Sequence, residues 1–174
     1  MKFFFTADEH FNHNNIIKYC NRPFKDIDEM DTMIIKRHNE FIWYDDYVIH
    51  AGDFTLRDKE FADKIINRLN GTHIFLKGSH DYWIPEEGSL KIWEDKIEGQ
   101  YIVICHYAMK TWAKSHYNSW QLFGHSHGEL KGVGKQMDIG VDTHNFYPYS
   151  FNEIKRIMSK KEDNFNLVKK WKNN

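Results

Sequence analysis

Residues 119–130 read SWQLFGHSHGEL, a stretch that starts as a β-strand and ends in a turn rich in histidine. The apolar residues Trp120, Leu122 and Phe123 form a short run of the kind that favours a buried strand. The turn that follows places His125 and His127 between two glycines, which allow a backbone to approach a ligand closely. The stretch therefore predicts a strand whose carboxyl end carries two histidines into a binding site.

Four other apolar runs end in the same kinds of side chain. They are KFFFTADEH (2–10), YVIHAGDF (47–54), THIFLKGSHDYW (72–83) and QYIVICHY (100–107). Each run is short and rich in Phe, Ile, Val or Tyr, so each predicts a buried strand rather than a helix.

Segments with helical periodicity lie between and after these strands, at residues 26–42, 58–71 and 150–161. We expect Asp26 or Asp28 to cap the start of the first helix, and Ser150 or Asn152 to cap the start of the third. Asn70-Gly71 is a C-terminal signal for the second helix. Strands that alternate with helices predict an α/β layered fold with at least partly parallel sheets. Ligands of such sheets bind beyond the carboxyl ends of the strands, so we expect all five strand ends to converge on one site.

Composition sets the broad class of the protein. The chain has 174 residues, 41% of them hydrophobic, and no break rich in Pro or Gly, so we expect a single domain over residues 1–174. A formal net charge of −1 offers no large basic field for long nucleic acid. Two cysteines and the lack of a long apolar run predict a cytoplasmic protein with no disulfide framework and no membrane partner.

The strand-end residues are of the types that hold transition metals. Taken singly the motifs are weak, because Asp8-x-His10 and Gly52-Asp53 are ordinary turn sequences. The ordered set predicts metal binding, since imidazole and carboxylate suit Mn, Fe, Co, Ni and Zn, and a carboxylate can bridge two ions. Two ions about 3.5–4 Å apart can clamp the attacking and leaving oxygens of a phosphoryl group. The lack of a thiolate cluster argues against a structural zinc site.

The motif order DEH, GD, GSHD, CHY and GHSH, from Asp8 to His127, resembles that of the calcineurin-like metallophosphoesterase superfamily. That family shows Asp-x-His, Gly-Asp, Gly-Asn-His-Asp or -Glu, a lone His, and Gly-His-x-His. NHNNIIKYCNRPF (12–24) and DIGVDTHNFYPYSFNEI (138–154) are similar to segments of a small bacterial and phage branch. The resemblance implies β-sheets flanked by helices, with a two-metal site at the carboxyl ends of the strands.

The resemblance also implies roles for individual residues. Asp8, His10 and His127 would hold one metal, and His106 and His125 the other, with Asp53 as the bridge. His80 would be the catalytic histidine, oriented by Asp81. A hydroxide held by the metals would attack the phosphorus of a small phosphodiester or nucleotide. We expect two divalent ions, with Mn favoured over Fe, Ni, Co or Zn.

Ser79 departs from the family pattern, which has Asn at this position and uses its carbonyl as a ligand to the second metal. A hydroxyl is shorter and a weaker donor, so Ser79 predicts a looser second site or a different metal or substrate preference. Three alternatives stay open: a phosphomonoesterase, a nuclease of the same fold, or a metal-poor scaffold without catalysis.

Four residues are candidates for binding substrate. His13 and Asn14 follow the first metal motif closely and could contact phosphate or sugar, although Asn14 or Asn15 could equally cap a helix. Arg22 could pair with a phosphate, and the alternative is a surface arginine beside Pro23. His116, in the loop before the last motif strand, could face the site.

Overall fold

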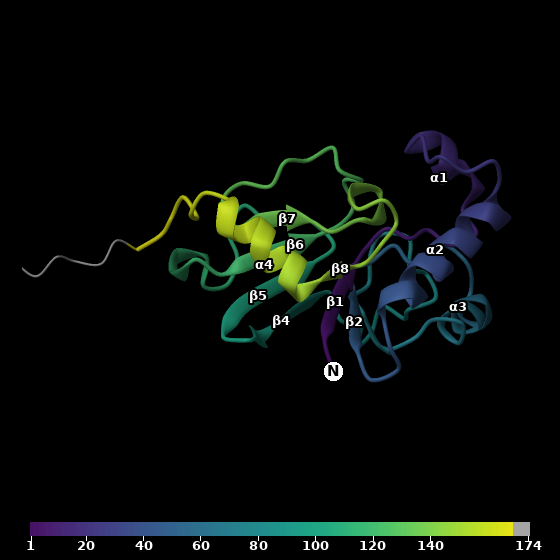
Figure 1. Cartoon of the computed structure of the whole chain (residues 1–174), viewed down its shortest axis with the longest axis horizontal. Helices are drawn as coiled ribbons and strands as arrows, with labels where there is room; N and C mark the ends of the chain where they lie inside the picture. The colour runs from purple at the N-terminus through teal and green to yellow at the C-terminus, as the bar shows by residue number, and fades with distance from the viewer. Residues whose placement is uncertain (169–174) are drawn as a thin grey trace, which may run out of the picture.

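The computed structural model describes residues 1–168 and contains two four-stranded sheets (Figure 1). In the first sheet, β1 (Phe3–Thr6), β2 (Tyr47–His50) and β3 (Thr72–Phe75) run parallel, and β8 (Tyr149–Ser150) pairs antiparallel with β1. In the second, β4 (Ile92–Ile97) is antiparallel to β5 (Gln100–Cys105), which runs parallel to β6 (Trp120–Phe123), itself parallel to β7 (Gln136–Asp138). The carboxyl ends of five parallel strands therefore supply the predicted motifs.

Side chains that alternate along the strands divide the core into layers. Phe5 and Ile49 pack in one cluster with Ile104 and Leu122 of the second sheet, so the two sheets share a core. On the other face of the first sheet, Phe4 packs in a separate buried cluster with Val48 and Ile42.

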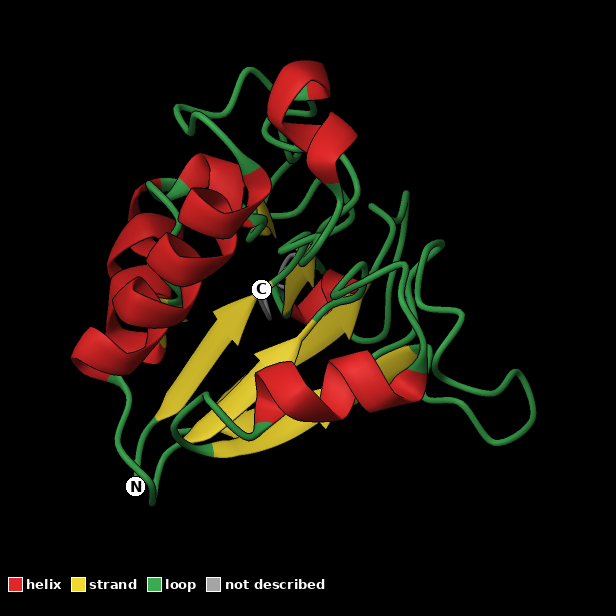
Figure 2. Ribbon diagram, turned by 90° about the vertical axis from the view of Figure 1, so that its right-hand side faces the viewer, coloured by secondary structure: helices red, strands yellow, loops and turns green. Residues whose placement is uncertain are grey.

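Within residues 1–168, four α-helices cover these layers, and Figure 2 shows helices on both sides of the strands. They are α1 (Asn14–Tyr19), α2 (Ile27–Phe41), α3 (Lys59–Ile66) and α4 (Phe151–Lys160). A core cluster that includes Ile16, Ile34 and Ile65 joins α1, α2 and α3. Within residues 1–168, none of the helices has the length and apolar character needed to cross a bilayer.

The predicted α/β layered fold, with a site at the carboxyl ends of the strands, is confirmed. Asp26 caps α2 by accepting from the backbone of Glu29, and Ser150 forms a capping box with Glu153 at the start of α4. Sequence reasoning missed β4, whose central residues are charged and exposed, and the very short β7 and β8.

Two predicted helix ends are wrong. The helix α3 ends at Ile66 rather than at Asn70-Gly71, because Arg68 and Leu69 bond to the third residue back, as in a 3₁₀ turn. The N-cap of α1 is His13, with no side-chain hydrogen bond, rather than Asn14 or Asn15.

Candidate metal centre

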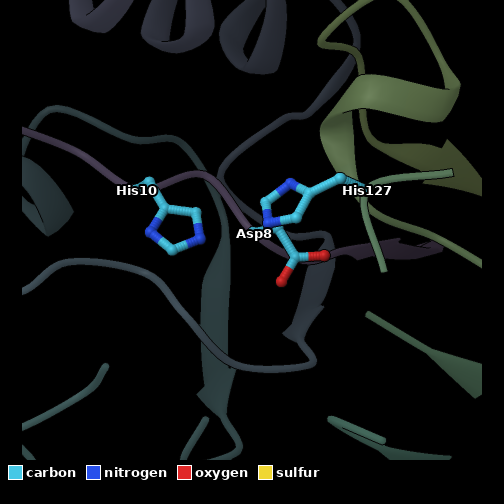
Figure 3. A group of neighbouring side chains, drawn as sticks. All are labelled: Asp8, His10 and His127. Carbon is cyan, nitrogen blue, oxygen red and sulfur yellow. The ribbon is translucent and has the colours of Figure 1, made fainter. Parts of the chain in front are cut away.

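The five strand ends meet in one place, and four of them, those of β1, β2, β5 and β6, supply two groups of three candidate metal ligands. The first triad is Asp8, His10 and His127, and the second is Asp53, His106 and His125. Within each triad the ligand atoms lie within 4.8 Å of one another. Figure 3 shows the first triad, in which Asp8 and His10 come from the segment after β1 and His127 from the turn after β6.

Asp53 belongs to the second triad and also lies close to the first. Its Oδ2 atom is 3.3 Å from Nε2 of His106, 3.7 Å from Nε2 of His10 and 4.0 Å from Nε2 of His80. The Nε2 atoms of His10 and His106 are buried and have no hydrogen-bond partner among the described residues. Buried nitrogens without partners are costly unless a ligand satisfies them, so this arrangement fits metal binding beside Asp53.

Burial and hydrogen bonds set the ring orientation and the charge of the side chains around Asp53. His106 donates from Nδ1 to the carbonyl oxygen of Ala51, at 2.9 Å, so Nε2 is the ring nitrogen that faces Asp53. Burial lowers the pKa of His10 to about 2, so its imidazole is neutral. Burial alone would raise the pKa of Asp53, but the His106 side chain and the backbone N–H of His80 hold it below its ordinary value.

Asp8 adds a buried negative charge to the first triad. Both of its carboxylate oxygens accept from the backbone N–H of His125, at 2.9 and 2.8 Å. Burial raises the pKa of Asp8 well above its ordinary value, and nearby Asp138 and Asp53 raise it further. A bound divalent cation would reverse this effect, because it stabilises the ionised carboxylate directly.

The backbone is strained at the candidate ligands. Five of the six triad residues have positive φ: Asp8 (59°), His10 (54°), Asp53 (59°), His125 (69°) and His127 (47°). Each such residue costs about 1–2 kcal/mol relative to an ordinary conformation. Strain of this kind concentrates at functional sites, where the surrounding structure maintains it.

Glycines let other backbone segments approach the two carboxylates closely. A Cβ at Gly78 would lie 2.3 Å from Oδ1 of Asp53, and one at Gly124 would lie 2.9 Å from Oδ2 of Asp8. Both glycines belong to the motifs quoted above. They shape the site without supplying a ligand atom, because any larger residue would collide with the carboxylates.

Asp142 is a residue that sequence reasoning missed. Its Oδ2 lies 2.7 Å from Nδ1 of His127, which orients that imidazole so that Nε2 is free to bind a metal. The same carboxylate accepts from Nε and Nη2 of Arg22, both at 2.8 Å. These interactions hold the pKa of Asp142 below its ordinary value, although burial acts to raise it. The available signal was that Arg22 and Asp142 lie in the two segments, 12–24 and 138–154, that resemble one phosphoesterase branch.

Both predicted roles for Arg22 are wrong. The residue is 4% exposed, so it is neither a surface arginine nor free to bind a phosphate. Its remaining donors bond to the backbone oxygens of Asp8 and Glu9, at 2.7 and 2.9 Å. Arg22 therefore connects the loop that carries Asp8 and His10 with the carboxylate that orients His127.

The sequence led us to expect that Asp81 orients His80, and this prediction is wrong. Its carboxylate accepts from the backbone N–H of Asp53 (2.7 Å), Phe54 (2.9 Å) and Gly78 (2.9 Å), and from Nε1 of Trp83 (3.0 Å). Asp81 thus holds the loop that carries the bridging candidate Asp53.

The other residues of the third motif lie close to Asp53. Ser79 donates from Oγ to the Asp53 carboxylate, at 3.1 Å from Oδ2 and 3.3 Å from Oδ1. His80 is partly exposed, and its Nδ1 has no partner among the residues described. The metal-ligand role of Ser79 and the catalytic role of His80 stay predictions.

Of the remaining candidate substrate residues, only His13 lies next to the candidate metal ligands. His13 lies beside the centre, with its ring 5.4 Å from that of His10 and 6.3 Å from that of His80. Asn14 is the exposed first residue of α1, and none of the described hydrogen bonds links its side chain to the site. The prediction for His116 is wrong, because it lies in a short 3₁₀ turn (Ser115–Tyr117) before the amino end of β6, whereas the site lies beyond the carboxyl end.

Comparisons with known proteins agree with the fold but name no activity for a close relative. No protein-family model matches the chain. The uncharacterized protein MJ1445 of Methanocaldococcus jannaschii is 29% identical over 168 residues, which cover 91% of this chain and 92% of that protein. The crystal structure of AQ665 from Aquifex aeolicus, a protein of unknown function, has a TM-score of 0.70 at 22% identity and covers 90% of this chain and 98% of its own. This likeness shows a shared fold.

A lower structural similarity is found to a conserved uncharacterized protein of Streptococcus pneumoniae TIGR4, described as a predicted phosphoesterase. Its TM-score is 0.47 at 15% identity, over 80% of this chain and 70% of that one.

Proposed function

We propose that this protein is a metal-dependent phosphoesterase of the calcineurin-like superfamily, which hydrolyses one ester bond of a small phosphodiester or nucleotide. The observation that supports this proposal is the position of Asp53, which belongs to the second triad and lies next to the first, with the Nε2 atoms of His10 and His106 buried and unpartnered beside it. A scaffold that binds no metal would gain nothing from the strained backbone at five of these six residues.

The residues present fit a pair of divalent cations, and manganese is our first expectation because the ligands are imidazole and carboxylate. Asp8, His10 and His127 would hold one ion, and His106 and His125 the other, with Asp53 shared and Ser79 a weak additional donor. Two bound cations would activate a water molecule and neutralise charge on the phosphate.

His80 is assigned the proton transfer. In the net reaction, water adds to phosphorus, the P–O bond to the leaving group breaks, and the leaving oxygen takes up a proton. The partly exposed His80 lies beside Asp53 and lines the cleft next to the triads, so its ring can reach the leaving oxygen. The small phosphorylated substrate and the cytoplasmic location expected from the sequence are part of this proposal.

The test compares turnover and metal content of the purified protein before and after metal removal. Bis-p-nitrophenyl phosphate and p-nitrophenyl phosphate distinguish diesterase from monoesterase activity. We expect hydrolysis to stop after chelation and to return with Mn²⁺. His80→Ala should lose activity, and His116→Ala is the matched control, since it removes an exposed histidine remote from the centre. Full turnover without metal would overturn the proposal.

A further inference from the structure

A cleft of about 670 Å³ opens beside the first triad. The side lined by the centre is formed by His10, His80 and His127, and the remaining lining, called the outer wall here, includes Ile16 and Tyr19 of α1, Leu56, and Glu129 of the loop that follows β6. This volume lies in the range of about 300–1,000 Å³ typical of sites for one small organic ligand. Because His80, the proposed proton donor, lines this cleft, we assign the cleft to the leaving group of the proposed reaction.

The charges of the described cleft lining disfavour a second phosphate. Its described lining contains no lysine or arginine, and its one carboxylate is that of Glu129, which would repel a further anion. Two arginines near the centre are otherwise engaged: Arg22 is buried against Asp142, and Arg57 donates to Asn12 and lies over the ring of Phe61. A substrate with one phosphate at the metal centre and an uncharged organic group in the cleft fits this distribution.

The chemistry of the outer wall favours a flat group with hydroxyl or amino substituents. Tyr19 is 74% exposed, and its ring lies at 76° to that of His13, with centroids 6.3 Å apart. Ile16 and Leu56 add apolar surface to the same cleft. Glu129 can accept hydrogen bonds from such substituents, and an exposed tyrosine ring offers a stacking surface to a nucleobase.

We propose that the cleft binds an uncharged nucleoside, so that the substrate is a nucleoside that carries a single phosphate group. The inference rests on the proposed function for the position of that phosphate. The inference predicts that mononucleotides and their esters bind better than nucleoside diphosphates and triphosphates.

The first test uses adenosine and the metal-free protein, so that it does not depend on hydrolysis. Saturation-transfer NMR should detect adenosine bound to the unmodified protein. Tyr19→Ala should weaken this binding about 5- to 100-fold, the effect of losing one stacking contact, and Tyr19→Phe should restore it. Tyr44→Ala is the matched control, because Tyr44 is 84% exposed and lies in the turn before β2, remote from the cleft.

The second test measures inhibition of bis-p-nitrophenyl phosphate hydrolysis by AMP, ADP and ATP with Mn²⁺ in excess. We expect AMP to inhibit best, and Glu129→Lys to reduce its advantage over ADP. Equal inhibition by all three nucleotides, or unchanged adenosine binding in Tyr19→Ala, would overturn the inference. Metal-dependent hydrolysis of the diester in the same experiment would still support the proposed function. Adenosine binding without any metal-dependent hydrolysis would instead reject the proposed function and leave the nucleoside site.

Discussion

Asp142→Asn is the substitution that most sharply tests how this centre is held together. Asp142 contributes no ligand to the two triads, yet one of its oxygens, Oδ2, serves both His127 and Arg22, and the other serves Arg22. An amide nitrogen at the Oδ2 position would meet the Arg22 Nη2–H and would donate to Nδ1 of His127, which places the imidazole proton on Nε2. At the Oδ1 position it would meet the Arg22 Nε–H. Either orientation removes a hydrogen bond that the carboxylate makes.

The expected magnitude follows from these contacts. Loss of a carboxylate behind a metal-binding histidine costs about 10- to 100-fold in metal affinity. Arg22 has a fully buried side chain, and breaking a buried ion pair by removal of one charge costs about 3–5 kcal/mol of stability. Asp142→Asn should therefore weaken metal binding and also lower the free energy of unfolding of the metal-free protein.

Calorimetric titration with Mn²⁺ and denaturant unfolding in chelator measure the two effects separately. Asp45→Asn is a matched control, because it neutralises an exposed carboxylate that only pairs with the amino terminus. Metal affinity in Asp142→Asn equal to that of the unmodified protein would refute the proposed role of Asp142 in orienting His127.

Three further predictions concern single side chains. His80→Ala should keep its metal but lose about 10²- to 10⁴-fold in turnover, and metal loss in this variant would show that His80 is a ligand instead. Ser79→Asn should lower the Mn²⁺ concentration for half-maximal activity by about tenfold, if the amide adds about 1.4 kcal/mol of ligation, and tight occupancy of both sites before the substitution would contradict this. Burial lowers the pKa of His38 to about 3 from 6.5, so the unfolded chain binds the extra proton and stability falls as pH drops below 6.5. His38→Gln should reduce the slope of unfolding free energy against pH by about 1.4 kcal/mol per unit, and an unchanged slope in denaturant titrations would refute the assignment.

Sequence patterns predicted the strands that carry the centre because each is a short apolar run that ends in a chemically distinctive turn. Convergence of the strand ends followed from the same pattern, since the carboxyl ends of parallel strands meet at one edge, whereas the division of the ligands into two triads came from the resemblance to a known family. Patterns of this kind describe local structure, so they missed β4, an edge strand in which three exposed charged residues, Glu94, Asp95 and Lys96, follow one another.

Contacts over long sequence separations were not predictable in the same way. Arg22 and Asp142 are 120 positions apart, and their ion pair depends on how the loop after α1 folds back on the first triad. Asp81 is adjacent to His80 in the sequence, but its side chain turns toward the Asp53 loop, which offers more backbone donors than the imidazole does.

The central claim is that two divalent cations bind on either side of Asp53. The direct measurement is a crystal structure of Mn²⁺-soaked protein, with anomalous difference maps at the manganese edge, for the unmodified chain and for Asp53→Asn. The account predicts two anomalous peaks, one within each triad, and loss of at least one of them in Asp53→Asn. No peak at either triad in the unmodified protein, or two undiminished peaks in Asp53→Asn, would contradict it.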